Sequence, residues 1–222
     1  MSWHDRGKGL GWRLAATAAA LAVWFWTQAL LGGRPSGGAG IGDGLHRLCE
    51  PVHRYLESSP RAADALLITS SAGIDALALF LLGSWVLAGK LRPFLGLALL
   101  LGLRQLTQAL CALPPPPGMI WHDPGVPSLL VTYGVANDFF FSGHTAIAVF
   151  GSTELARLGR GWAVLGALLA VFEIFAVVAL RAHYTMDVFA GILAALTVAA
   201  VAEPWSARIA GRFRSTGSAS GA

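Results

Sequence analysis

Six long apolar runs constrain this chain more than any other feature. A helix needs about 20 mostly apolar residues to cross a bilayer, and six segments are close to that length. They are Leu14–Leu31, Ala65–Ala88, Pro93–Leu113, Phe139–Leu158, Trp162–Leu180 and Met186–Ala202. None alternates apolar and polar residues with period two, so helices fit better than barrel strands. The sequence therefore predicts an all-α polytopic membrane protein, a bundle of six transmembrane helices.

The composition agrees with a membrane protein and argues against other classes. Of the 222 residues, 55% are hydrophobic and 13% are charged, whereas an average soluble domain has about 25% charged residues. A soluble enzyme, a disordered chain and a coiled coil do not have this composition. The net charge is +4, but the basic residues stand beside the apolar runs and form no basic stretch with aromatics. No nucleic-acid partner is expected.

Lys and Arg are distributed unevenly over the connections between the runs. With six helices, ten of them fall on the side of the two termini and five on the other, with Arg104 inside a helix. By the positive-inside rule, both termini are cytoplasmic, in a plasma or inner membrane. The chain then has a cytoplasmic segment 1–13, a six-helix catalytic domain 14–202 and a polar cytoplasmic tail 203–222. A second interpretation stays open, in which Met1 to about Gly33 is a cleaved signal peptide.

Two long connections lie on the outer side in this topology. Residues 32–64 begin with a Gly-rich stretch and continue with apolar residues at helical spacing, which predicts an interfacial amphipathic helix. These apolar residues are Leu45, Leu48, Val52 and Leu56. Residues 114–137 are rich in proline and contain no Lys or Arg, so we expect a rigid, extended cover on the outer face.

Charged residues inside the predicted spans need an explanation, because each costs at least a few kcal/mol in the bilayer. At about 1.5 Å per residue, Asp75, Arg104 and Glu173 all fall in the outer half of the membrane. They predict a hydrated polar layer that opens outward. Gln108 lies one turn after Arg104 on the same face, which favours an anion site. Structural ion pairs, Asp75 with Arg104 or Arg104 with Glu173, remain the alternative.

The first chemical motif runs from Asn137 to Thr145 and places Ser142, Gly143 and His144 in the opening turn of a predicted helix. Unpaired backbone N–H groups and the helix dipole favour a phosphate at such a position. His144 can act there as a proton donor close to the anion. The motif therefore predicts phosphate chemistry.

The second motif runs from Arg181 to Asp187. His183 and Asp187 are four residues apart, so they share one face of a helix and the carboxylate can orient the imidazole as a nucleophile. Arg181 supplies a charged clamp for phosphate oxygens. Together, the two motifs suggest phosphoryl transfer through a phosphohistidine.

Other interpretations stand beside this one. We interpret His4, His46, His53 and His122 as ordinary polar residues of the membrane interface. A metal held by His144, His183 and Asp187 is conceivable, but Arg181 and Arg104 would repel a divalent cation, so neither a metal nor another cofactor is expected. Cys49 and Cys111 share the outer side and either pair as a disulfide or remain free.

The motifs resemble those of the type-2 phosphatidic acid phosphatase superfamily and, more closely, its sphingomyelin-synthase-like branch. Asp138, three further residues and Ser-Gly-His-Thr match one motif of that branch, and His183-Tyr184-Thr185-x-Asp187 matches the next. The segment from Arg104 to Met119 is similar to the branch's Arg-x-x-Thr…Leu-Pro-x-Pro-Gly-Met stretch. Arg181, two residues before the histidine, resembles the plant phosphatidylcholine:diacylglycerol cholinephosphotransferases, which belong nearby.

Departures from these patterns are informative. Ala136-Asn137 replaces the Cys-Gly of sphingomyelin synthases, and this argues against ceramide as the acceptor. The phosphatase superfamily's Lys-x6-Arg-Pro motif is absent, and Val177 replaces its Arg six residues before the second histidine. Arg104 and Arg181 are then the unassigned cations on the outer side, and both are expected to bind the phosphate.

The resemblance implies a role for each motif residue. His183 would attack phosphorus, Asp187 would orient it, and His144 would protonate the departing lipid alkoxide and later take the proton of the acceptor hydroxyl. Four further residues are expected to bind the phosphate or the substrate: Asp138, Ser142, Gly143 and Tyr184. An apolar lid formed by Phe139–Phe141 and the proline-rich loop would exclude water and favour transfer over hydrolysis.

The expected function is therefore transfer of a phosphocholine- or phosphoethanolamine-type head group from a membrane phospholipid to a lipid hydroxyl. Diacylglycerol and ceramide are both candidate acceptors, and with water as acceptor the chain would be a lipid phosphatase or a hydrolase of the phospholipase C type. A non-catalytic lipid carrier or structural bundle is an interpretation from another class. The partners are the bilayer and its lipids, and association into homo-oligomers stays open.

Overall fold

The computed structural model describes Ala19, Ala22 and Trp26, and then residues 41–111, 113–131, 133 and 140–219. The chain divides into two compact units, Met1–Gly42 and Asp43–Ala222, and each is described by itself. In the first unit Ala19, Ala22 and Trp26 are helical, whereas residues 41 and 42 are not. The rest of the first predicted span, Leu14–Leu31, and the signal-peptide alternative lie outside the described residues.

The second unit is all-helical over its described residues. Its seven helices are α2 (Gly44–Leu48), α3 (Glu50–Ser58), α4 (Pro60–Val86), α5 (Leu91–Leu110), α6 (Gly143–Ala156), α7 (Arg160–Ala179) and α8 (Thr185–Ala219). Four of these are long and apolar enough to cross a membrane: α4, α5, α7 and the Thr185–Ile209 part of α8. The all-α prediction is confirmed for this part of the chain.

The fourth predicted span, Phe139–Leu158, is a shorter helix than expected. α6 has 14 residues, so it is about 21 Å long at 1.5 Å per residue, against a hydrocarbon core of about 30 Å. Its first turn begins only at Gly143, because Phe141 has a positive φ of 71° and Ser142 takes the extended N-cap conformation. The described part of the chain therefore shows four candidate spans and one short apolar helix where six spans were predicted in all.

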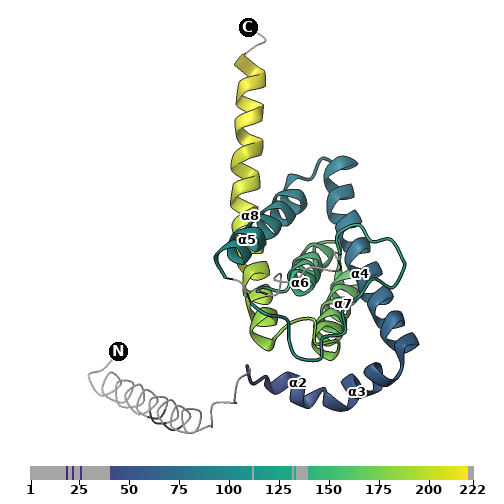
Figure 1. Cartoon of the computed structure of the whole chain (residues 1–222). Helices are drawn as coiled ribbons and strands as arrows, with labels where there is room; N and C mark the ends of the chain where they lie inside the picture. The colour runs from purple at the N-terminus through teal and green to yellow at the C-terminus, as the bar shows by residue number, and fades with distance from the viewer. Residues whose placement is uncertain are drawn as a thin grey trace, which may run out of the picture. The chain divides into compact units, whose positions relative to one another are not determined.

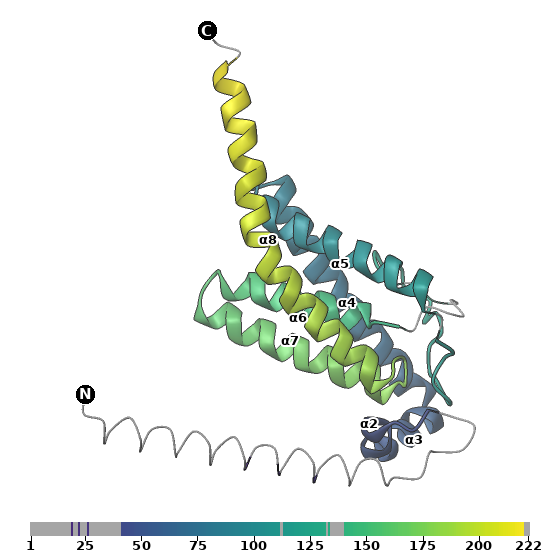
Figure 2. The ribbon, with the colours of Figure 1, turned by 90° about the vertical axis from the view of Figure 1, so that its left-hand side faces the viewer.

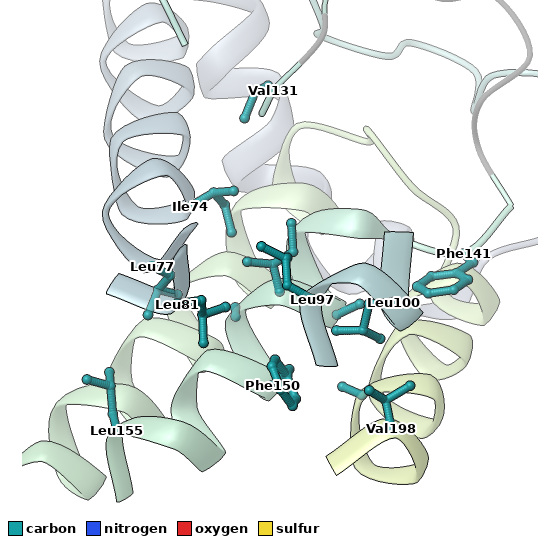
Figure 3. Packing of buried hydrophobic residues seen from close by; sticks show 14 residues of the cluster. Ile74, Leu77, Leu81, Leu97, Leu100, Val131, Phe141, Phe150, Leu155 and Val198 are labelled. Atoms are coloured by element: carbon teal, nitrogen blue, oxygen red, sulfur yellow. The ribbon is translucent and has the colours of Figure 1, made fainter. Parts of the chain in front are cut away.

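α6 forms the centre of the bundle and contacts α4, α5, α7 and α8, as Figure 1 shows. Its Phe150 is fully buried within a cluster that includes Leu81, Leu97 and Val198 (Figure 3). α5 approaches this ring closely at Gly96, where an added Cβ would lie 2.0 Å from the Phe150 ring. The apolar packing around α6 fixes the position of its N-terminal turn, which carries the Ser-Gly-His motif.

Ionic contacts join α5, α6 and α8 at the end of the bundle where α6 terminates. Arg92 pairs with Glu154, whose side chain is 5% exposed. The Nε atom of Arg92 also lies 2.8 Å from Glu203 Oε2. Arg157 also binds Glu203, at 2.9 Å. The predicted tail from residue 203 onward continues α8 as helix to Ala219, and Glu203 at its beginning ties this turn to α5 and α6.

The opposite end of the bundle carries α2 and α3 beside the turn that joins α7 to α8, as Figure 2 shows. The predicted amphipathic helix is present as two short helices, since α3 starts anew with Pro51 in its first turn. Leu56 is buried together with His46 and His53, whereas Leu48 and Val52 are 76% and 37% exposed. The interfacial position of this segment stays a prediction.

The proline-rich loop forms no helix over residues 113–131, as its prolines predict. It is fixed at two places. The Ile120 N–H donates to the Leu180 carbonyl at 2.9 Å, and the loop binds the Asp75 carboxylate of α4 through the Ser128 hydroxyl at 2.9 Å and the Leu129 N–H at 2.8 Å. The loop therefore connects the site-bearing turn before α8 to the middle of α4.

Candidate functional site

The two sequence motifs meet where α6 and α8 begin. The Ser142 N–H donates to the Asp187 carbonyl oxygen at 3.0 Å, so one motif is hydrogen-bonded directly to the other. Gly191, one turn further along α8, makes this approach possible, because an added Cβ would lie 2.8 Å from the Ser142 carbonyl oxygen. The structure thus brings Ser142-Gly143-His144 and His183-x-x-x-Asp187 together.

The Ser-Gly-His segment is built as a helix start. Ser142 is fully buried and its hydroxyl accepts a hydrogen bond from the Thr145 N–H at 3.3 Å, which caps α6. Phe141, just before it, has the left-handed φ that non-glycine residues adopt only when their surroundings impose it. Phe141 is 2% exposed and belongs to the core. Phe139 and Asp138 lie outside the described residues, so the lid expected of Phe139–Phe141 stays a prediction.

His144 is 9% exposed, in the first turn of α6. The Trp121 ring of the proline-rich loop meets it edge-on, with ring centroids 5.3 Å apart. Among the described residues, its Nε2 atom has no hydrogen-bond partner although it is buried. A buried, unsatisfied imidazole nitrogen is costly, and a bound substrate oxygen would satisfy it.

His183 lies in the turn before α8, and Asp187 lies in the first turn of that helix. The distance from His183 Nδ1 to Asp187 Oδ2 is 3.8 Å, close enough for an ionic contact but too long for a hydrogen bond. Asp187 is fully buried, and its Oδ2 accepts a hydrogen bond from the Tyr184 N–H at 2.9 Å. The carboxylate faces the imidazole as expected, but α8 begins at Thr185, so His183 precedes the helix and the two residues do not share a helical face.

Arg104 lies across the N-terminal turn of α6. A Cβ added to Gly143 would be 3.0 Å from Arg104 Nε, so a larger residue at this position would push the guanidinium away by a few tenths of an ångström. Arg104 Nη1 also reaches Gln108 Oε1 at 3.5 Å. A cation therefore stands beside the positive end of a helix dipole, and an anion bound there would relieve the repulsion.

Arg181 has a different environment. Its guanidinium forms a salt bridge with Glu50 of α3, and Nη1 donates to the Pro117 carbonyl at 3.0 Å. The backbone of Arg181 is left-handed, with φ of 52°. Two non-glycine residues with positive φ, Phe141 and Arg181, thus stand next to the two motifs, and they are the only such residues in the described part of the chain.

Tyr184 and the polar layer have structural partners. The Tyr184 hydroxyl donates to the Pro115 carbonyl at 3.4 Å. Asp75 holds the proline-rich loop, as described above. Glu173 is fully buried and its Oε2 accepts the Ser70 hydroxyl at 2.6 Å. Val177, which replaces an arginine of the phosphatase pattern, is buried in an apolar cluster.

Sequence reasoning missed the residues of α2 and α3 that contact this site. His46 and His53 were interpreted as ordinary interface residues, yet both are buried and hydrogen-bonded to backbone carbonyls around His183. Their spacing of seven, two helical turns, was the available signal. His122 was interpreted in the same way; it is half exposed and binds Asp64 at 2.7 Å. His4 lies outside the described residues.

Two further expectations concern cysteines and metals. Cys49 and Cys111 are both free thiols in the structure. Among the described residues, no group of three His, Cys, Asp or Glu side chains is arranged to hold a metal ion.

A comparison with protein families gives one match. The family model described as AtPDCT1/2 matches residues 43–204, a range that begins at Asp43 and includes both motifs. No curated protein matches the chain, and no solved structure does.

Gly191→Ala tests the contact between the two motifs. The new methyl group would meet the Ser142 carbonyl oxygen at 2.8 Å and displace the start of α6 from that of α8. Because a shift of about 1 Å in a catalytic group can cost 10²-fold in rate, we expect at least a tenfold lower turnover of phospholipid. Gly211→Ala in the same helix, where no atom lies within 4 Å of the added Cβ, is the matched control. Equal activity of both variants would contradict the importance of this contact.

Proposed function

The chain belongs to the AtPDCT1/2 family, a family of phosphatidylcholine:diacylglycerol cholinephosphotransferases, and we propose that it transfers phosphocholine from phosphatidylcholine to the hydroxyl of diacylglycerol. The family is enzymatic and acts on membrane phospholipid head groups, in agreement with the transferase interpretation of the motifs. The resemblance to sphingomyelin synthases remains an interpretation, and ceramide is not proposed as acceptor. The observation that carries the proposal is the meeting of the His144 and His183 motifs at the starts of α6 and α8.

In the first half of the reaction, His183 is the nucleophile. Its Nδ1 faces the Asp187 carboxylate, which leaves Nε2 to attack the phosphorus of phosphatidylcholine. The bond between phosphorus and the glycerol oxygen breaks, and His144 gives its proton to the departing alkoxide, which leaves as diacylglycerol. Phosphocholine is then bound to His183 through a P–N bond.

The second half reverses these roles. His144, now neutral, takes the proton of the hydroxyl of a second diacylglycerol, whose oxygen attacks phosphorus. The P–N bond breaks, and a new phosphatidylcholine leaves. The distance of 3.8 Å between His183 and Asp187 is expected to shorten when positive charge develops on the imidazole, because catalytic hydrogen bonds in ligand-free structures are often long.

The phosphate is held mainly by Arg104 in this proposal. Its guanidinium lies beside Gly143 at the start of α6, where the backbone N–H groups of the first turn also favour an anion. Arg181 is engaged with Glu50 and the Pro117 carbonyl, so it would have to exchange these partners to bind phosphate. A direct contribution of Arg181 remains a prediction.

Water as the acceptor would make the chain a hydrolase of the phospholipase C type. The burial of His144 and His183, at 9% and 6% exposure, and the Trp121 edge against His144 support a site with little water access and hence transfer. A non-catalytic carrier would need neither histidine.

Purified protein in phosphatidylcholine micelles with labelled diacylglycerol tests the reaction. We expect labelled phosphatidylcholine from the native chain, no product from His183→Ala, and a loss of several orders of magnitude in Asp187→Asn, as when the orienting carboxylate of a catalytic triad is changed. His122→Ala, which removes an exposed outer histidine, is the control and should retain full activity. Free phosphocholine as the main product would favour the hydrolase, and an active His183→Ala would contradict the covalent mechanism.

The site is proposed to face the extracytoplasmic side, with both termini in the cytoplasm. The uneven Lys and Arg distribution supports this, as does the position of Arg92 and Arg157 at the bundle end away from the histidines. A single cysteine introduced as His122→Cys, in a chain with Cys49 and Cys111 replaced by serine, should react with an impermeant maleimide on intact cells. Labelling only after lysis would reverse the topology.

A further inference from the structure

The turn that carries His183 is fixed from outside by the α2–α3 segment, defined here as Gly44–Ser58 with its N-cap residue Asp43. The His46 Nε2–H donates to the carbonyl oxygen of His183 itself, at 2.9 Å. The His53 Nδ1–H donates to the Ala179 carbonyl at the end of α7, also at 2.9 Å. Both histidines are buried, at 7% and 1% exposure, so these bonds are shielded from competing water.

Asp43 holds the other side of the same turn. Its carboxylate accepts the Thr185 N–H and the Thr185 hydroxyl, each at 2.6 Å, and also accepts the His46 N–H at 3.1 Å. One carboxylate therefore caps the starts of both α2 and α8. Burial acts to raise the pKa of Asp43, but the hydrogen bonds from Thr185 and His46 outweigh it and lower the pKa. The group stays ionised at neutral pH, as a cap at a helix N-terminus requires.

These contacts lie at the proposed nucleophile and two residues after it. Asp43 fixes Thr185, the first residue of α8, and His46 fixes the carbonyl of His183 two residues earlier. The ring of His46 also stacks on Tyr184, with centroids 5.9 Å apart. The backbone thus has partners in the α2–α3 segment at His183 and Thr185, and the Tyr184 ring between them packs on His46.

The turn needs such partners because it lies between two helices. His183 precedes α8, so its backbone has no place in a helical hydrogen-bond ladder, and Arg181 just before it has a left-handed φ that costs energy. The α2–α3 segment adds hydrogen bonds from outside the turn to those that the turn makes with Val177, Ile120 and Asp187.

We propose that Asp43 and His46 are positioning residues that hold His183 in line for attack on phosphorus. The inference rests on the proposed role of His183 as nucleophile. Their effect is on the rate of the chemical step, because a nucleophile displaced by about 1 Å can lose 10²-fold in rate while substrate binding is maintained. Neither residue needs to touch the lipid.

Two pairs of variants test this in the purified full-length chain. His46→Leu removes the donor, whereas His46→Gln places an amide N–H close to the position of Nε2 and should rescue. Thr185→Val removes the hydroxyl that Asp43 binds, whereas Thr185→Ser keeps it. We expect kcat to fall by about tenfold to 10²-fold in His46→Leu and Thr185→Val, with KM for phosphatidylcholine within twofold of the native value and near-native kcat in the rescue variants.

Leu56→Ala is the structural control, because Leu56 is buried in the same segment but has no hydrogen bond to residues 183–185. It should lower the thermal midpoint while kcat per folded molecule is unchanged. If His46→Leu and Thr185→Val behave like this control, the positioning role is wrong and the segment only stabilises the fold. If His46→Leu does not fold, the comparison of kcat between Thr185→Val and Thr185→Ser alone decides whether the positioning role is correct.

The His183→Ala variant separates the two hypotheses. If it is inactive while His46→Leu and Thr185→Val keep native kcat, the proposed function stands and the positioning inference fails. If His183→Ala remains active, the nucleophile is misassigned and the positioning inference fails with it.

Discussion

The contact between the starts of α6 and α8 is the constraint on which the rest of the site depends. The two helices approach with their N-termini at the same end, joined by the Ser142 to Asp187 hydrogen bond and by the close packing at Gly191. Two positive helix ends side by side repel each other. At α8, the carboxylates of Asp43 and Asp187 compensate for this charge. At α6, the cap is the neutral Ser142 and Arg104 lies beside Gly143 in the first turn, an arrangement that suits the phosphate of a lipid head group.

Packing elsewhere in the bundle serves this arrangement. α6 is surrounded by α4, α5, α7 and α8. The packing of Phe150 against Gly96 fixes the position of α6 along its axis. The ionic contacts of Arg92 and Glu154 hold its far end. The proline-rich loop, bound to Asp75, brings Trp121 to the edge of His144. Each contact limits a movement that would separate the two histidine motifs.

The sequence was sufficient to predict that the two histidine motifs lie at helix starts, because their signals are local. One signal is an N-cap residue followed by Gly-His, and the other is His and Asp four residues apart. Both signals depend only on helix geometry, and the structure places the two motifs at the starts of α6 and α8. The roles of His46 and His53 could not be predicted, since their partners are backbone carbonyls 137 and 126 residues away and a carbonyl has no sequence signature. Arg181 was expected at the phosphate for its charge and for its position two residues before His183, and only the fold reveals Glu50 beside it. The six-span count failed to foresee the short α6, because hydropathy does not register the left-handed turn at Phe141.

A trapped intermediate on His183 would test the central claim most directly. Protein incubated with phosphatidylcholine without added diacylglycerol, denatured in base and digested with trypsin, yields residues 182–208 as a peptide in which His183 is the single histidine. Mass spectrometry should find one phosphocholine adduct on this peptide, absent from His183→Ala. Two results would contradict His183 as the nucleophile. One is an adduct on the peptide of residues 105–157, which contains His144. The other is no adduct in a preparation that converts phosphatidylcholine.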